Sequence, residues 1–129
     1  MKYLCLGYYD ADRFDGLSPA EQQALGDECR PHDEALRASG RLVAVASLEH
    51  RTSAVLRPGK GRTSIIDGPF TESKELVGSF FIIEAGDLDD AIRVASLHPA
   101  ANVREDLGFA IEVRPIETYV EADRTQPPG

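Results

Sequence analysis

The sequence has no tryptophan, one methionine and only two cysteines among its 129 residues. Two cysteines, Cys5 and Cys29, are too few for a disulfide framework and do not form a C-x-x-C pair, so we expect reduced thiols in a cytoplasmic protein. The N-terminal run MKYLCLGYYD lacks the longer apolar core of a signal peptide. No segment approaches the roughly 18–20 apolar residues of a membrane span, so we expect no membrane partner.

Positive charge is also scarce. Lys and Arg number 14 against 22 Asp and Glu, for a formal net charge of −8. Phosphate binding depends largely on Lys and Arg that displace counterions, so this balance argues against a nucleic-acid partner. The three histidines, His32, His50 and His98, share no i,i+4 spacing and have no cysteine pair beside them. We therefore predict neither a metal site nor a cofactor.

The composition that remains is that of one globular domain. Apolar residues make up 42% of the chain and charged residues 28%. A chain of 129 residues can bury a core without stabilisation by disulfides or metal ions. The segment 121–129 carries two prolines and no apolar pattern. We expect a single domain over residues 1–120 and a flexible C-terminal tail over 121–129.

Two strands are expected to be apolar on both faces. Lys2–Tyr9 alternates Leu4, Leu6 and Tyr8 with Tyr3, Cys5, Gly7 and Tyr9. Gly78–Ala85 places Phe80 and Ile82 on one face and Phe81 and Ile83 on the other. Doubly apolar strands are typical of central positions in a sheet. The expected strands are 2–9, 41–48, 52–56, 62–66, 78–85 and 110–117, with the turn of a hairpin at 57–61.

The first helix is expected to begin after Ser18, with Pro19 at its first position and Glu21 closing a capping box. Gly40 ends it. Pro31 lies inside and predicts a kink or two short helices joined end to end. The expected inward stripe is Leu25, Cys29, His32 and Leu36.

The second helix is expected to begin after Asp87 and to end at His98-Pro99, because a residue before proline avoids the helical region. Its expected buried stripe is Leu88, Ala91, Ile92 and Ala95.

The resulting order is β-α-β-β-α-β with an extra hairpin, which is the split β-α-β plan. Two helices cover only one face of such a sheet. Because the central strands are apolar on both faces, we expect a second copy of the sheet to cover the other face, which predicts a homodimer.

The run Asp67-Gly68-Pro69-Phe70, followed by Thr71–Glu75 and Gly78–Ala85, resembles the signature of DGPF proteins, a branch of the YCII-related family. The run Glu112–Ile116 resembles that family's C-terminal strand. The resemblance implies an α+β ferredoxin-like fold of the dimeric α/β-barrel type. Few members have an assigned activity, although some relatives are fused enzymatic domains.

DGPF genes often lie near genes for extracytoplasmic-function sigma factors. The resemblance therefore also implies a bacterial protein and leaves open a regulatory role with a protein partner in transcription.

In the YCII branch, a histidine in the first helix and an aspartate just after the second helix are the proposed active pair. In this chain the first position falls near Cys29, with His32 three residues later, and the second is occupied by His98-Pro99. The pair therefore does not carry over intact.

His98 is the leading candidate for acid–base chemistry. A helix C-terminus favours a protonated imidazole, and an ordinary histidine pKa of roughly 6.5 suits proton transfer near neutrality. The alternative is a C-terminal helix cap. Asp67 is its expected catalytic partner, although Asp at the start of a turn also has the structural role of bonding backbone amides.

The remaining candidates would bind a ligand. Lys74 is either a solvated lysine or the group that holds an anionic part of a substrate. His32 is either a satisfied, partly buried histidine or a pocket residue. Arg114 alternates outward on the last strand, where it can face a partner sheet. His50 is expected to be exposed, and Cys29 to be an inert thiol. The expected ligand-binding residues are Tyr3, His32, Lys74 and Arg114.

The leading hypothesis is a dimeric domain that binds an unidentified small molecule, with acid–base catalysis by His98 and Asp67 as its sharpest form. The sequence leaves open whether the protein is an enzyme. The alternative is a non-catalytic regulatory or interaction module associated with sigma-factor function.

Overall fold

One antiparallel sheet organises the chain. The computed structural model describes residues 1–69 and 75–122. Within them the sheet has the strand order β2-β5-β1-β6, and every neighbouring pair is antiparallel. Both doubly apolar strands are central, as predicted. The strands of this sheet are β1 (Lys2–Asp10), β2 (Leu42–Ser47), β5 (Glu75–Glu84) and β6 (Ala110–Pro115).

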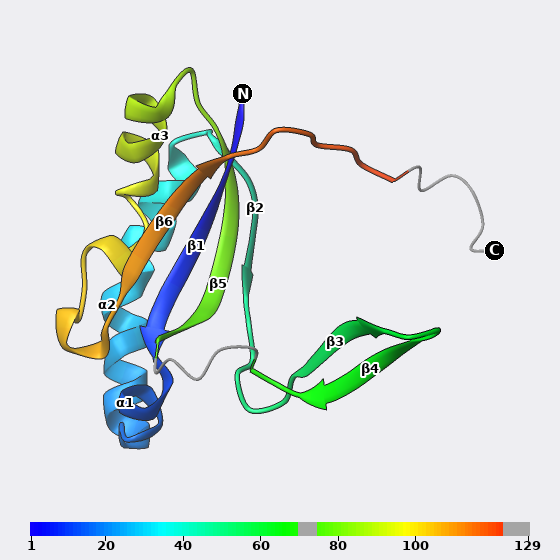
Figure 1. Ribbon diagram of the computed structural model, residues 1–129. Coiled ribbons are helices and arrows are strands. Elements are labelled where there is room, and N and C mark those ends of the chain that lie inside the picture. Colours follow the sequence, from blue (N-terminus) through cyan, green and yellow to red (C-terminus); the bar gives the residue numbers. More distant parts are fainter. Residues whose placement is uncertain (70–74, 123–129) are drawn as a thin grey trace.

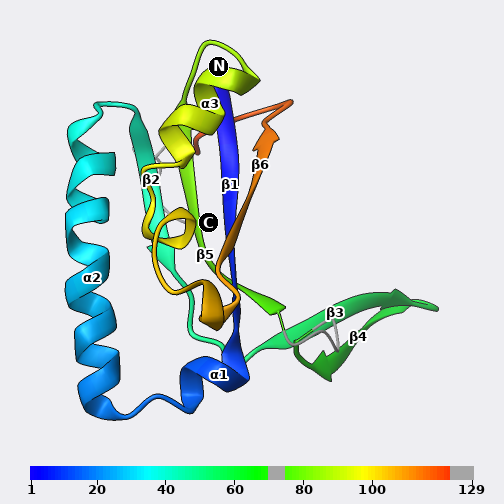
Figure 2. The same ribbon diagram turned by 90° about the vertical axis from the view of Figure 1, so that its left-hand side faces the viewer.

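The helices all lie on one side of this sheet (Figures 1 and 2). With the hairpin set aside, the chain runs strand, helix, two strands, helix, strand, and the central strands are the first and third of these four. This is the split β-α-β arrangement, so the predicted α+β ferredoxin-like fold is confirmed. The helices are α1 (Ala11–Asp15), α2 (Pro19–Ala38) and α3 (Leu88–Ala95), with two short 3₁₀ turns, η1 (Pro99–Ala101) and η2 (Glu105–Leu107).

Helix α2 begins with the predicted capping box. The Ser18 hydroxyl accepts from the Glu21 amide at 3.1 Å, and the Glu21 carboxylate accepts from the Ser18 amide at 3.0 Å. The expectation of two short helices was wrong, because α2 continues as one helix through Pro31 (Figure 2). Gly40 follows with a positive φ of 72°, the left-handed conformation that ends helices.

Helix α3 starts at the predicted cap, where the Asp87 carboxylate accepts from the Asp90 amide at 2.8 Å. Its buried stripe was placed wrongly in part. Leu88 is 49% exposed and Ile92 47% exposed, whereas Val94 is buried with Ala91 and Ala95. The helix is only eight residues long and contacts β5 and β6, so its inward face is narrower than the apolar pattern implied.

The hairpin β3 (Ala54–Gly59) and β4 (Arg62–Asp67) forms its own two-stranded sheet and projects from the main sheet on the side away from the helices (Figure 1). Its turn is shorter than expected, since Gly59 pairs with Arg62. Gly61 has a φ of 76°, which suits a tight turn. Helix α1 follows β1 directly and begins where the Asp10 carboxylate accepts from the Arg13 amide at 3.2 Å.

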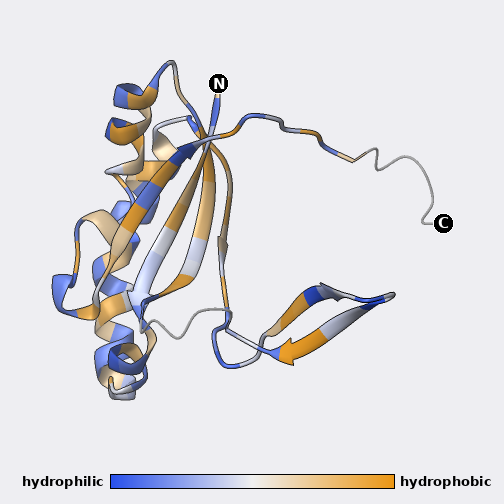
Figure 3. Cartoon of the chain, viewed as in Figure 1, coloured by the Kyte–Doolittle hydropathy of each residue, from blue (hydrophilic) through white to orange (hydrophobic). Residues whose placement is uncertain are grey.

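The core lies between the sheet and the helices. Its side chains come from the odd positions of β1, from Phe81 and Ile83 of β5 and from the inner faces of α2 and α3. Hydrophobic positions run along β5 and β2 (Figure 3). In β1 and β5, Leu4, Leu6, Phe80 and Ile82 alternate with the core residues and so point to the other face of the sheet. No described helix is both long and apolar enough to cross a membrane.

Candidate functional site

A cavity of about 340 Å³ opens between α2 and the sheet, at the end of the sheet nearer α1. Its volume falls within the roughly 300–1,000 Å³ typical of small-molecule sites. Its wall comes from β1, β2, β5, α1, α2, η1 and the segment before β6. Its polar side chains are Asp33, Ser47, His50, Ser79 and His98, and its larger apolar ones include Phe14, Val45, Leu48 and Phe109.

Small residues in the two central strands leave this space open. Gly7 of β1 pairs with Ser79 of β5, one step beyond the large pair Cys5 and Phe81 on the same face. A Cβ at Gly7 would collide with the Ser79 hydroxyl. Just beyond, the register shifts so that Gly78 of β5 is an extra residue, a β-bulge of the kind found beside functional sites.

His98 is held firmly in the cavity wall. The residue is 8% exposed, and its ring stacks on Phe81 with centroids 4.5 Å apart and an interplanar angle of 1°. Its Nδ1 accepts from the backbone amide of Ala100 at 3.0 Å, which caps η1. An Nδ1 that accepts carries no proton, so the neutral ring has its hydrogen on Nε2.

The Nε2–H of His98 opens to the cavity. No described residue bonds this atom, and among residues 1–69 and 75–122 no buried side-chain nitrogen or oxygen lacks a partner. Nε2 must therefore keep accessible surface, and His98 lines the cavity. Burial lowers the pKa of His98, and the nearby Asp33 carboxylate raises it less strongly. The net effect favours the neutral ring.

Helix α2 contributes Cys29 and Asp33, which lie four residues apart and so share a face. The pKa of the Cys29 thiol is raised, chiefly by burial and further by Asp33 and Glu28. A raised pKa keeps the thiol protonated, so the expectation of an inert Cys29 agrees with its surroundings.

A second histidine lines the same cavity. The expectation that His50 is exposed was wrong, because its side chain is only 12% exposed. Its Nε2 lies 3.0 and 2.9 Å from the two oxygens of Asp15 in α1. The His50 ring belongs to an aromatic cluster with Tyr9 and Phe14, whose rings meet edge to face. The ring centroids of Tyr9 and His50 are 5.6 Å apart, and those of Tyr9 and Phe14 are 5.8 Å apart.

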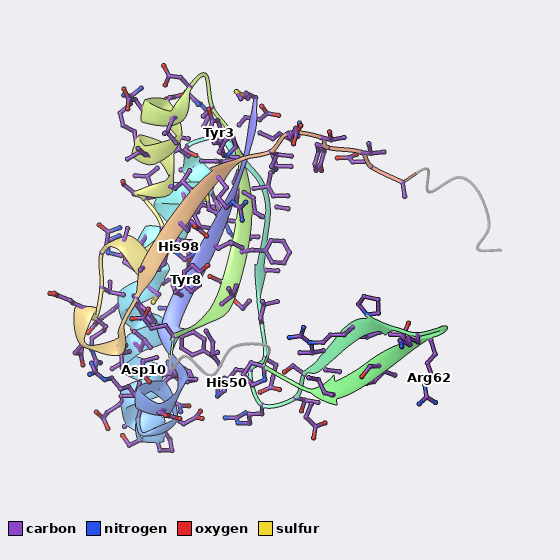
Figure 4. The ribbon with its side chains drawn as sticks, viewed as in Figure 1. Tyr3, Tyr8, Asp10, His50, Arg62 and His98 are labelled. Carbon is purple, nitrogen blue, oxygen red and sulfur yellow. The ribbon has the colours of Figure 1, made fainter. Side chains whose placement is uncertain are left out.

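The structure brings only His98, of the residues singled out for a site, to this cavity. Asp67 ends β4 in the projecting hairpin and does not line it, so the pairing of His98 with Asp67 gains no support within one chain. Tyr3 is buried at the opposite end of β1 from His50 (Figure 4). His32 is half-buried on α2 but outside the cavity wall, and Lys74 lies outside the described residues.

Arg114 lies on the open face of the sheet. It pairs with Leu4 across β1 and β6, two residues along from Glu112, which accepts from the Tyr8 hydroxyl at 3.2 Å. It therefore points away from the cavity, which is on the helix side.

Sequence reasoning missed Asp33 and the His50–Asp15 pair. The i,i+4 relation of Asp33 to Cys29 was a usable signal, since Cys29 stood at the helix position expected to face a site. The His50–Asp15 pair had no such signal, because 35 residues separate the two partners.

Within the described ranges, no three His, Cys, Asp or Glu side chains gather in a way that could hold a metal ion. Among the described residues of the cavity wall there is likewise no Lys or Arg. What the wall offers is an N–H donor at His98, hydroxyl groups, a carboxylate and aromatic surface.

Comparison with known proteins places the chain among relatives. The YCII-related domain matches residues 1–117. An uncharacterised protein of Rhizobium meliloti (strain 1021) is 32% identical over 120 residues, covering 92% of this chain and 94% of that protein. A solved structure of 5-chloro-2-hydroxyhydroquinone dehydrochlorinase from Burkholderia phenoliruptrix, in complex with 2,5-dihydroxybenzoquinone, covers 91% of this chain and 94% of its own, at 20% identity and a TM-score of 0.45.

Proposed function

The chain belongs to the YCII-related domain family, and from that premise we propose that it binds a small molecule in the His98 cavity and performs acid–base chemistry there. The observation that carries this proposal is the state of His98. A buried, neutral imidazole presents Nε2–H to a partly apolar cavity that is open on one side. Such a group donates a hydrogen bond to a substrate oxygen more effectively than it would in water.

His98 and Asp33 form a His–Asp combination in which the two residue types are exchanged relative to the family's proposed pair. The first long helix supplies Asp33, and the position after the second supplies His98. Asp33 is near enough to raise the pKa of His98 against the stronger effect of burial. We propose Asp33, in place of Asp67, as the carboxylate that accompanies the hydrogen-bond donor His98.

The proposed ligand is small, uncharged and largely apolar, with at least one acceptor oxygen. The described part of the wall includes the Asp33 carboxylate and no Lys or Arg, which disfavours an anion there. Phe14, Phe109 and Tyr9 offer flat surfaces for a planar molecule. A neutral planar ketone such as 2-indanone is therefore a suitable probe.

The test is a substitution at the rim of the cavity that fills it with a larger side chain. Val45 of β2 lines the cavity and is 43% exposed, so Val45→Trp can fill the space without disturbing the core. We expect it to weaken 2-indanone binding, measured by saturation-transfer NMR, at least about tenfold, or about 1.4 kcal/mol. Val43→Trp is the matched control, since Val43 is 39% exposed on the same strand but outside the cavity.

Equal binding by the two tryptophan variants and the wild type would place the ligand elsewhere. Failure of neutral carbonyl probes to bind the wild type would remove the proposed ligand class.

We also propose that the protein is a homodimer and lies in the cytoplasm. The open face of the sheet carries Leu4, Leu6, Phe80 and Ile82 of the two central strands, none of which a helix covers. Covering such a face with its copy would bury these side chains at about 25 cal/mol per Å² of apolar area. The free thiols Cys5 and Cys29 agree with a reducing compartment.

A second candidate function, a protein-interaction module in transcription regulation, draws on the β3–β4 hairpin. Leu56 and Ile65 face each other across it and are 65% and 69% exposed. If this arm binds an extracytoplasmic-function sigma factor, the double variant Leu56→Lys, Ile65→Lys should abolish capture of such a factor. Capture by the variant equal to that by the wild type would contradict this role.

A further inference from the structure

We propose that His50, oriented by Asp15, is the catalytic base of the cavity and works opposite His98, which serves as the hydrogen-bond donor. This inference rests on the proposed function and assigns the second group that acid–base chemistry requires. Two imidazoles, those of His50 and His98, line one cavity, and a different ring nitrogen of each bonds to the protein.

His98 is unsuited to act as a base. Its Nδ1 lone pair is already used by the Ala100 amide, and its Nε2 carries the hydrogen. To accept a proton it would have to give up the bond that caps η1 while flat against Phe81. Another group must take a proton from the substrate.

His50 has the complementary arrangement. A carboxylate can only accept hydrogen bonds, so the two contacts of His50 Nε2 with Asp15, at 3.0 and 2.9 Å, place the ring hydrogen on Nε2. Nδ1 then holds a free lone pair. No described residue bonds Nδ1, and no buried side-chain nitrogen among the described residues lacks a partner, so Nδ1 keeps accessible surface. Since the ring lines the cavity, this lone pair is available to a bound molecule.

Aromatic and charged side chains hold the His50 ring in place. The ring is 5.6 Å from Tyr9 and 6.3 Å from Phe14, both edge-to-face. Asp15 is the carboxylate paired with it, Glu49 is the neighbouring residue and Arg51 reaches Asp15 at 3.8 Å. The pairing of Nε2 with Asp15 therefore fixes the orientation of the ring.

The reaction class that follows is proton abstraction next to a carbonyl. His50 Nδ1 takes the proton from the α-carbon, and the C–H electron pair becomes the C=C bond of an enolate. The carbonyl π pair moves to oxygen, where His98 Nε2–H donates to the developing negative charge. Return of a proton from His50 to carbon regenerates the ketone, so in D₂O the net result is exchange of hydrogen for deuterium.

Figure 4 shows His50 nearer α1 and His98 further along the sheet, and both residues line the cavity. A ketone bound between these two residues would direct its carbonyl oxygen toward His98 and the adjacent α-carbon toward His50. Asp15 acts through His50 and is a positioning residue.

The experiment follows α-proton exchange of 2-indanone in D₂O by ¹H NMR, with binding of the same ketone measured separately by saturation transfer. The wild type should accelerate exchange above the buffer rate. His50→Gln should keep binding within about threefold and lose about 10²-fold or more of the enzymatic exchange rate, the usual size of a general-base contribution. Asp15→Ala should lower the rate and shift the His50 ring away from the Nε2–H tautomer in ¹⁵N spectra, and Asp15→Glu should restore both in part.

Asp12→Ala is the control for α1, since Asp12 is exposed on that helix and does not line the cavity. Binding without accelerated exchange, or full exchange by His50→Gln, would overturn the role of His50 and leave the proposed binding function intact. Exchange that is lost together with binding in His50→Gln would show a structural role and also overturn it. Absence of binding to the wild type would overturn both.

Discussion

Three contacts determine the chemical state of His98. Stacking on Phe81 excludes water from one ring face, the Ala100 amide occupies Nδ1, and the surrounding residues bury the ring to 8% exposure. Each disfavours the imidazolium. Asp33 opposes them, but its effect on the pKa is smaller than that of burial.

The lowered pKa of His98 makes stability depend on pH. Its folded pKa lies below the ordinary value of the unfolded chain, so its contribution is fully present above about pH 6.5 and is lost as pH falls through the folded pKa. Between about pH 7.5 and about pH 5.5, the free energy of unfolding from urea titrations should fall more for the wild type than for His98→Gln. His32→Gln is the control and should follow the wild type. Parallel curves for the wild type and His98→Gln would contradict the neutral, buried state.

At the residue scale, the sequence could predict that His98 follows a helix and that Cys29 faces inward. It could not predict that Asp33, rather than Asp67, lies near His98, because that depends on how α2 packs against η1. It also could not predict the Phe81 stack, which joins residues of two different elements.

The junction between β2 and α3 depends on one carboxylate. Asp90 accepts from Arg41 Nη1 at 2.8 Å, from the Gly86 amide at 2.9 Å and from Arg93 at 3.2 Å. These bonds, with the Arg41 hydrogen bond foremost, lower the pKa of Asp90 to about 2. Arg41 also donates to the Glu84 carbonyl at 3.0 Å, so the pair ties α3 to the ends of two strands.

The Asp90 carboxyl should therefore titrate with a midpoint near 2 in ¹³C NMR of the folded chain. Because the folded pKa is depressed, the stabilisation from this carboxylate is present above its ordinary pKa of about 3.8 and is lost as pH falls toward about 2. Arg41→Gln should move the midpoint upward, whereas Arg30→Gln, on another helix, should not. A midpoint near 3.8 in the wild type would contradict the network.

Element boundaries followed the sequence where local chemistry decides them. The caps Ser18 and Asp87 and the end at Gly40 lie where capping rules put them, because each acts within a few residues. The predicted end of the second helix at His98-Pro99 was wrong, because α3 already ends at Ala95 and Pro99 begins η1. Which faces of a short helix are buried depends on the neighbouring elements, so Leu88 and Ile92 were misplaced. The expectation of two short helices gave Pro31 too much weight, because α2 continues through this residue.

At the scale of the whole molecule, the uncovered sheet face predicts self-association. Ile82 lies on this face at the centre of the sheet, opposite Leu4 and Ala44. Ile82→Glu should convert a dimer into a monomer, since a charge at the centre of an apolar interface is left unpaired. Leu88→Glu is the control, because Leu88 is exposed at the start of α3 on the helix side.

Native mass spectrometry can measure both variants. The wild type and Leu88→Glu should be dimers and Ile82→Glu a monomer with an unchanged circular dichroism spectrum. A monomeric wild type would contradict the predicted homodimer. The topology itself could be predicted from the sequence, because doubly apolar central strands and two helices permit few arrangements.

The most direct test of the account is the ring state of His98 in the full chain, read from long-range ¹H–¹⁵N correlations at neutral pH with and without saturating 2-indanone. The account predicts a neutral ring with its hydrogen on Nε2, and a change in the Nε2–H resonance when the ketone binds. An imidazolium, a ring with its hydrogen on Nδ1, or an Nε2–H resonance that bound ketone leaves unchanged would contradict it.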